Sequence, residues 1–288
     1  MTEIKTRIIR NAKELAEFAK QAQRSGKTIG LVPTMGYLHE GHLSLIRAAR
    51  EKADVVIVSD FVNPTQFGPK EDYATYPRDE AADLAKVQSC NADVLFIPTV
   101  DTLYPNGQDS TWVEVMNMGK ILCGASRPGH FRGVATVVTK LLLLSRADYA
   151  FFGEKDYQQL TILRRMVEDI GCQTEIIGMP LVRESDGLAL SSRNVRLSED
   201  ARKQALSLSR GLRKARDLFH TGCRDAKKLA DETRSEIAAQ PDAQIEYITL
   251  AHPDTLEIYT DSVPDKVIML IAVRVGGVRL IDNMKLWC

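Results

Sequence analysis

Residues 28–58 read TIGLVPTMGYLHEGHLSLIRAAREKADVVIV and contain the clearest indication of the fold class. The apolar run 28–32 predicts a buried strand that ends at Pro33, and residues 41–53 predict an amphipathic helix. A second apolar strand follows at once over residues 54–58. Two short apolar strands joined by an amphipathic helix are typical of a parallel sheet with helices packed on it.

The same alternation continues on both sides of this unit. Asn11, with Glu14 three residues later, predicts a capped helix that Gly26 ends. Further helices are expected at 80–90, 134–146 and 157–170, and further strands at 94–97, 149–152 and 175–177. Repeated alternation of short strands and helices predicts a doubly wound parallel α/β sheet.

After about residue 183 the pattern changes. Two charged helical ranges precede three strand-like runs, with helices expected at 198–221 and 224–239 and strands at 245–250, 267–273 and 278–281. Gly276-Gly277 fits a hairpin turn between the last two strands. We therefore expect two domains, one over residues 1–183 and a smaller α+β domain with an antiparallel sheet over residues 184–288.

Composition excludes several classes of protein. Lys plus Arg and Asp plus Glu both number 38 in 288 residues, so nothing indicates a nucleic-acid partner or an anionic membrane. The five cysteines contain no CxxC pair, which argues against a disulfide framework or structural zinc and favours a reducing cytosol. The N-terminus lacks an apolar signal core, and the most apolar stretch, 134–144, is shorter than the ~20 residues that span a bilayer. A soluble cytoplasmic protein is expected.

The segment Pro33–His42 follows the first predicted strand and leads into a helix. Ligands of open α/β sheets bind beyond the carboxyl ends of the strands, and a helix N-terminus attracts phosphate. Gly36 and Gly41 let a nucleotide approach the backbone, and His39 and His42 can donate to phosphate oxygens. A glycine-rich turn with two surface histidines is the alternative. Two of the chain's five histidines in one turn favour a functional site.

Two other interpretations of this region fail on spacing. A zinc-protease helix needs His-Glu-x-x-His, whereas His39 and His42 are three residues apart. Gly26-Lys27-Thr28 looks like the end of a P-loop, but Gln21 stands where a P-loop has glycine. This tripeptide also precedes a strand instead of following one.

A second segment, residues 61–68, follows the second strand. Asn63 and Gln66 carry amide donors and acceptors suited to a hydroxy acid, and Phe61 and Phe67 supply apolar walls. Asn-Pro is equally an ordinary turn signal, so the segment by itself is weak evidence for a binding site. Its position at the same expected sheet edge as the first segment favours a binding role.

A third and a fourth segment add charge. In residues 151–159, Lys155 offers a cation for phosphate, Asp156 a carboxylate for ribose or metal, and Gln159 lies one turn further along the same helix face. In Leu190–Asn194, two serines precede an arginine, a combination that can clamp phosphate. A solvated helix start and an ordinary serine-rich loop are the alternatives.

Together, these segments resemble the pantothenate synthetase family, within the superfamily of nucleotidylyl transferases that share a His-x-Gly-His element. The matching sequence segments occur in the same order as in the family. They are PTMGYLHEGH (33–42), FVNPTQFG (61–68), YPR (76–78), HFRGV (130–134), FFGEKDYQQL (151–160) and DGLALSSRN (186–194). HEGH alone points only to the superfamily, whereas FGEKDYQQL with VNPTQF and LSSRN is specific for this member. The matches cover most of residues 28–197, and the region beyond about 200 is much less diagnostic.

The resemblance implies a Rossmann-like domain that binds ATP and pantoate and a C-terminal domain that closes over it as a lid. It also implies Mg²⁺ dependence and a homodimer. The implied reaction condenses (R)-pantoate with β-alanine to pantothenate, in vitamin B5 and coenzyme A biosynthesis. A pantoyl-adenylate is the implied intermediate, and AMP and pyrophosphate are released.

Roles at matching positions follow from the same resemblance. The expected catalytic residues are His42, His39, Lys155 and Arg193. The expected contacts to pantoate and β-alanine are Gln66, Gln159 and Asn63, and the acidic position associated with Mg²⁺ is Asp83. The expected ATP site comprises Met35, Gly36, Tyr37, Leu38, His39, Glu40, Gly41, His42, Gly153, Glu154, Lys155, Asp156, Val182, Leu190, Ser191, Ser192 and Arg193.

Two other functions are alternatives. Another nucleotidylyl transferase would share HEGH and Lys155 but has no obvious need for both Gln66 and Gln159. A non-catalytic nucleotide-binding regulator would bind ATP without turnover and would leave the His–Lys–Arg–Ser set unexplained. Pyrophosphate release that requires pantoate, with AMP formed only when β-alanine is added, separates the ligase from both.

Overall fold

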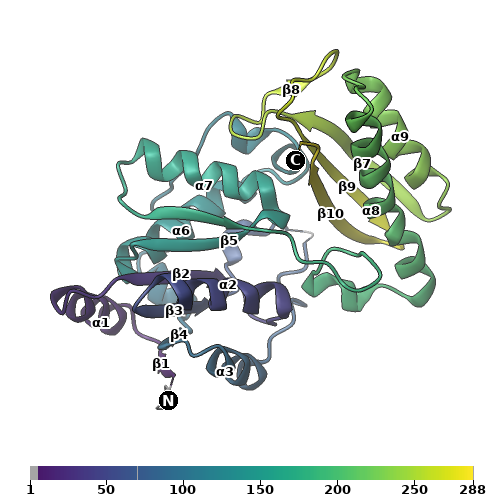
Figure 1. Ribbon diagram of the computed structural model, residues 1–288. Helices are drawn as coiled ribbons and strands as arrows, with labels where there is room; N and C mark the ends of the chain where they lie inside the picture. Colours follow the sequence, from purple (N-terminus) through teal and green to yellow (C-terminus); the bar gives the residue numbers. More distant parts are fainter. Residues whose placement is uncertain (1–5, 70, 288) are drawn as a thin grey trace. The chain divides into compact units, whose positions relative to one another are not determined.

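The computed structural model describes residues 6–69 and 71–287 (Figure 1). The chain divides into two units, as expected, but the sequence predicts a single boundary at about residue 183 and the structure has more than one. The structure also assigns a short internal segment to the second unit. Unit one comprises Met1–Glu154 and Ile162–Pro180, and unit two comprises Lys155–Thr161 and Leu181–Cys288.

A parallel sheet forms the centre of unit one. Its strands are β1 (Arg7–Ile9), β2 (Ile29–Thr34), β3 (Val55–Asp60), β4 (Val94–Phe96), β5 (Tyr149–Gly153) and β6 (Glu175–Met179). Within the described residues the sheet has six strands in the order β1-β4-β3-β2-β5-β6, and every neighbouring pair is parallel. The predicted doubly wound α/β fold is confirmed.

The longer helices of this unit divide by the direction in which they cross the sheet. They are α1 (Ala12–Arg24), α2 (Glu40–Lys52), α3 (Glu80–Ser89), α6 (His130–Ser145) and α7 (Tyr157–Asp169), and the short α4 (Val100–Leu103) and α5 (Cys123–Ser126) lie in the connections. α2 and α3 lead from β2 through β3 to β4, whereas α1, α6 and α7 lead the opposite way. Right-handed crossovers therefore place these two groups on opposite faces, and α1 contacts α6.

The strand order reverses between β2 and β5, because the chain runs from β2 toward β4 and from β5 toward β6. In doubly wound sheets, ligands bind at the carboxyl ends of the strands beside such a reversal. β2 and β5 pair directly, with Gly30 opposite Tyr149. The segments that leave these two strands are thus the ones that the fold places at the ligand-binding edge.

Several expected boundaries differ from the structure, and two of these differences concern the site. β2 continues through Pro33, which lies opposite Ser59 of β3, instead of ending there. A proline lacks a donor but can remain in a strand where the ladder does not need its N–H. α6 begins at His130 rather than at residue 134, after Gly129 with φ 81°. The HFRGV sequence therefore forms the first turn of a helix.

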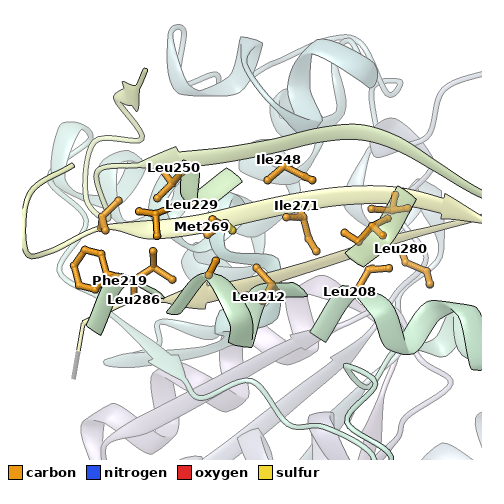
Figure 2. Close-up of a cluster of buried hydrophobic side chains, with 14 of the residues drawn as sticks. Leu208, Leu212, Phe219, Leu229, Ile248, Leu250, Met269, Ile271, Leu280 and Leu286 are labelled. Carbon is orange, nitrogen blue, oxygen red and sulfur yellow. The ribbon is translucent and has the colours of Figure 1, made fainter. Parts of the chain in front are cut away.

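Unit two packs two long helices on an antiparallel sheet. Its elements are α8 (Glu199–His220), α9 (Ala226–Ala238), β7 (Ala243–Ala251), β8 (Ile258–Tyr259), β9 (Ile268–Val275) and β10 (Val278–Lys285). The strand order is β10-β9-β7-β8. Figure 2 shows Leu208 and Leu212 of α8 facing Met269 and Ile271 of β9 in a buried cluster. Gly276 and Gly277 have φ 55° and 82° and close the predicted hairpin of β9 and β10.

The helices of the described residues do not meet the requirements of a membrane-spanning segment. None of those formed by residues 6–69 and 71–287 combines the length and apolar character needed to cross a bilayer.

Candidate active site

The turn that follows β2 has a constrained backbone. Gly36 has φ 76° and Tyr37 has φ 51°, so two consecutive residues are left-handed, which is uncommon for a residue with a side chain. A Cβ atom on Gly36 would also collide with Oδ1 of Asp60, at the end of β3. The left-handed backbone favours glycine at position 36, and a Cβ atom there would displace the Asp60 side chain, whether or not a nucleotide also approaches the backbone.

α3 holds this turn through two side chains. The Asp83 carboxylate accepts the backbone N–H of Tyr37 at 2.6 Å and that of Leu38 at 2.7 Å, and Asp83 is 0% exposed. Lys86, three residues later on the helix, donates to the Leu38 carbonyl at 2.7 Å. Several bonds thus converge on the left-handed turn, which is how a strained backbone persists.

Asp83 is also the position at which the family resemblance implies Mg²⁺. Each of its two carboxylate oxygens accepts a backbone N–H. Within residues 6–69 and 71–287, no group of three or more His, Cys, Asp or Glu side chains could hold a metal ion. This donor set does not fit a protein-held magnesium ion, so Mg²⁺ at Asp83 stays a prediction without support from these contacts.

Asp60 is a buried acid beside Asp83. The pKa of Asp60 is raised to about 7, first by burial and then by the charges of Asp83 and Glu80 and a hydrogen bond with Asp83, against the opposing charge of Arg78. A carboxyl that titrates near neutral pH therefore lies under the turn that leads to His39. Sequence reasoning did not single out Asp60, because its partners come from other elements.

We expect Asp60→Asn to flatten the pH dependence of stability. The pKa of Asp60 is raised from 3.8 to about 7, so between these values the folded protein keeps a proton that the unfolded chain loses. The stability from this group is complete below about pH 4 and is lost as the pH rises through about 7. Melting temperatures of both proteins between about pH 5 and pH 8 test this, and a difference between them that stays constant over that range would contradict it.

His39 and His42 lie face to face at the start of α2. Their ring centroids are 4.1 Å apart with an interplanar angle of 27°. The Nδ1 atom of His42 accepts the backbone N–H of His39 at 3.3 Å, so the neutral His42 ring carries its proton on Nε2. His39 is the N-cap residue of α2. The two predicted catalytic histidines are thus together, where the helix dipole also favours an anion.

Met35, Asn63 and Gln66 meet within unit one. Asn63 Nδ2 donates to Gln66 Oε1 at 3.1 Å, and Gln66 Nε2 lies 3.1 Å from Met35 Sδ. The Tyr104 hydroxyl donates to Asn63 Oδ1 at 2.8 Å. Asn63 is 1% exposed and Gln66 8% exposed. The structure therefore joins two residues expected at pantoate with one expected at ATP, and it adds Tyr104, which the sequence reasoning missed.

Unit two carries Val182 and Leu190 on a short hairpin, and Ser191, Ser192 and Arg193 directly after it. The Leu190 N–H donates to the Val182 carbonyl at 3.0 Å, and Arg183 forms an antiparallel bridge with Ala189. Val182 and Leu190 consequently lie side by side. The 3₁₀ turn η4 (Ser192–Arg196) follows, and its Ser191 cap accepts the N–H of Arg193 at 3.3 Å.

β10 anchors both this hairpin and the segment of Lys155. Asp282, 3% exposed, receives two hydrogen bonds from the Arg183 guanidinium at 2.7 and 2.9 Å. The neighbouring Asn283 donates from Nδ2 to the Lys155 carbonyl at 3.0 Å. Lys155 Nζ lies 3.6 Å from Asp156 Oδ1. Neither Asp282 nor Asn283 was expected, because the C-terminal region has no diagnostic motif.

The remaining predicted residues lie at the start of α2, at the end of β5 and at the start of α7. Glu40 and Gly41 open α2 beside the histidines, and Gly153 and Glu154 lie where β5 ends. Gln159 lies in the first turn of α7, in the part of that helix that belongs to unit two, and is half-buried.

Comparison with known proteins gives the same family from several sources. A family model described as pantoate-beta-alanine ligase matches residues 7–285. A pantothenate synthetase of Syntrophotalea carbinolica is 54% identical over 263 residues, covering 91% of this chain and 92% of that protein. One from Fervidobacterium nodosum is 50% identical over 282 residues, covering 98% of this chain and all of that protein, 100%.

Solved structures agree over the full length. The crystal structure of pantothenate synthetase from Thermus thermophilus has a TM-score of 0.92 and 43% identity, covering 98% of this chain and 100% of that chain. Pantoate-beta-alanine ligase from Francisella tularensis, complexed with beta-gamma ATP and beta-alanine, has a TM-score of 0.81 and 36% identity, covering 98% of each chain.

Proposed function

The chain belongs to the pantoate-beta-alanine ligase family, and from this membership we propose how its own residues join pantoate to β-alanine. One observation carries the proposal. The stacked His39–His42 pair and the buried Asn63–Gln66 pair follow β2 and β3, neighbouring parallel strands whose carboxyl ends share one sheet edge. N–H donors for phosphate beside amides for a hydroxy acid suit an enzyme that activates such an acid with ATP.

The proposed reaction has two displacement steps. A carboxylate does not react with an amine in water, because oxide is a poor leaving group. A pantoate oxygen therefore attacks the α-phosphorus of ATP, and the bond to pyrophosphate breaks to leave a pantoyl-adenylate. The β-alanine amine then attacks the acyl carbon, the bond to AMP breaks, and the amine proton is released. No side chain of the protein needs to form a covalent bond.

The residues of the site divide by charge. We assign His39, His42, Lys155 and Arg193 to the phosphates, because two anions must meet without repulsion. We assign Asn63, Gln66 and Gln159 to pantoate, since amides bind hydroxyl and carboxylate groups without adding negative charge. The rest of the nucleotide site is Met35–His42, Gly153–Asp156, Val182 and Leu190–Arg193. Mg²⁺ enters as part of the magnesium–ATP substrate, since ATP sites hold this ion largely through phosphates and water.

We expect Gln66→Ala to impair pantoate binding far more than ATP binding. Gln66 is 8% exposed, and loss of its amide leaves buried polar groups of the acid unpaired, at a cost of about 1–3 kcal/mol. Isothermal titration with each substrate measures both affinities. Unchanged pantoate affinity together with lost ATP affinity would reverse the assignment of the two sites.

The family resemblance also leads us to propose a homodimer in the cytoplasm. The thiols of Cys90, Cys172 and Cys223, which are not joined in disulfides, fit a reducing compartment. Light scattering coupled to size exclusion measures the mass in solution. A mass of about twice 32.1 kDa supports the dimer, and a monomer at all concentrations would oppose it.

A further inference from the structure

Two side chains converge on the backbone carbonyl of Gln66: His130, the first residue of α6, and Arg127, which follows α5. His130 Nδ1 lies 2.8 Å from this oxygen, and because a carbonyl only accepts, Nδ1 carries a proton. An Arg127 guanidinium nitrogen lies 3.4 Å from the same oxygen. His130 Nε2 lies 2.9 Å from Arg127 Nη1, so it acts as the acceptor there and the ring is neutral.

Arg127 is itself held by Glu71. Its guanidinium donates to both carboxylate oxygens, at 2.8 and 2.5 Å, and the two side chains are 16% and 25% exposed. Burial would raise the pKa of Glu71, but the hydrogen bonds and charge of Arg127 hold it below its ordinary value. Glu71, Arg127 and His130 thus form one connected chain of bonds that ends at Gln66.

The backbone of α6 also touches the turn that carries Gln66. A Cβ atom on Gly133 would collide with the Thr65 carbonyl and lie 2.8 Å from the Gln66 nitrogen. The Gly133 carbonyl accepts a hydrogen bond from Asn63 Nδ2 at 3.2 Å. Glycine is therefore required where the helix and the turn meet. His130 and Gly133 are the first and fourth residues of the HFRGV sequence, to which the proposed reaction assigns no role.

We propose that His130 is a positioning residue for pantoate, acting through Gln66. It fixes the Gln66 peptide on α6, while Asn63 and Met35 fix the side-chain amide. An amide held at both its backbone and its side chain presents its donor and acceptor in one direction. The inference rests on the proposed role of Gln66 in binding pantoate.

Steady-state kinetics of His130→Ala test the proposal. Loss of one hydrogen bond that orients the substrate contact should raise KM for pantoate about tenfold and leave KM for ATP unchanged. His130→Asn, whose amide nitrogen can replace Nδ1 as the donor, should recover most of the loss. His220→Ala is the matched control, because His220 Nε2 bonds the Leu286 carbonyl at the same 2.8 Å in unit two and should leave KM for pantoate unchanged.

A double variant separates positioning from a general loss of structure. If His130 acts through Gln66, adding His130→Ala to Gln66→Ala should raise KM for pantoate no further. Equal effects on KM for pantoate and ATP, or an additive effect in the double variant, would overturn the inference. Should His130→Ala fail to fold, His130→Phe keeps a ring against Phe131 and removes the donor, and the same outcomes decide.

The same variants show whether the proposed function or only the positioning role is wrong. If Gln66→Ala alone leaves KM for pantoate unchanged, the assignment of Gln66 to pantoate is wrong, and the positioning role of His130 falls with it. If Gln66→Ala raises KM for pantoate but His130→Ala does not, only the positioning role is wrong.

Discussion

Lys155→Ala is expected to slow adenylate formation by about 10³-fold or more while leaving the melting temperature nearly unchanged. In the proposed reaction, Lys155 supplies a compact positive charge to the triphosphate. Without it, the remaining groups compensate less of the repulsion between the pantoate carboxylate and the phosphates. Single-turnover release of pyrophosphate from pantoate and magnesium–ATP measures the rate of this step.

The prediction that Lys155→Ala leaves the melting temperature nearly unchanged follows from the contacts of Lys155. Its ammonium group lies 3.6 Å from a carboxylate oxygen of Asp156, and the two side chains are 21% and 47% exposed. An ion pair with a half-exposed acid in the adjacent residue contributes little to stability. Lys20→Ala removes another lysine that pairs with an exposed acid, Glu17, and should change neither quantity. A large fall in melting temperature for Lys155→Ala would make Lys155 structural, and a near-normal rate would remove it from the phosphate site.

His42→Ala is expected to keep the fold and slow adenylate formation about 10²-fold or more, as for loss of one donor to a developing charge. The reason is its place at the start of α2, where Nδ1 is engaged by the backbone of His39 and Nε2 carries the proton. Rapid-quench measurement of pyrophosphate release tests this directly.

A second histidine serves as the control for His42. His252 Nδ1 also accepts a backbone N–H, that of Asp254 at 3.1 Å, but it has no assigned role in the reaction. His252→Ala should therefore release pyrophosphate at the normal rate. Pyrophosphate release by His42→Ala at nearly the normal rate would show that the charge is stabilised elsewhere.

The sequence predicts the sheet well because burial follows a regular period. Strands buried on both faces, such as β3, read as continuous apolar runs, and amphipathic helices separate them. β1 was missed for the opposite reason: Arg7–Ile9 has three residues, of which two are exposed, so no pattern marks it. The assignment of Lys155–Thr161 to unit two depends on contacts such as Thr161 Oγ1 to the Pro253 carbonyl, which no local pattern contains.

The candidate site shows the same division. Short sequence motifs predict the turn at Pro33–His42 and the amides of Asn63 and Gln66, because the residue types themselves indicate their chemistry. The side chains that hold them come from distant elements: Asp83 for the turn and Asn283 for Lys155. For Asp83, the sequence supplies an acid and predicts a metal, whereas the structure shows it bonded to backbone N–H groups.

Exchange of labelled pyrophosphate into ATP shows whether a pantoyl-adenylate forms before β-alanine reacts. The protein is incubated with magnesium–ATP, pantoate and labelled pyrophosphate, with no β-alanine present. If the adenylate forms first, label enters ATP, omission of pantoate stops this exchange, and Lys155→Ala abolishes it. Exchange that strictly required β-alanine would mean a concerted reaction of three bound substrates and would contradict the adenylate scheme.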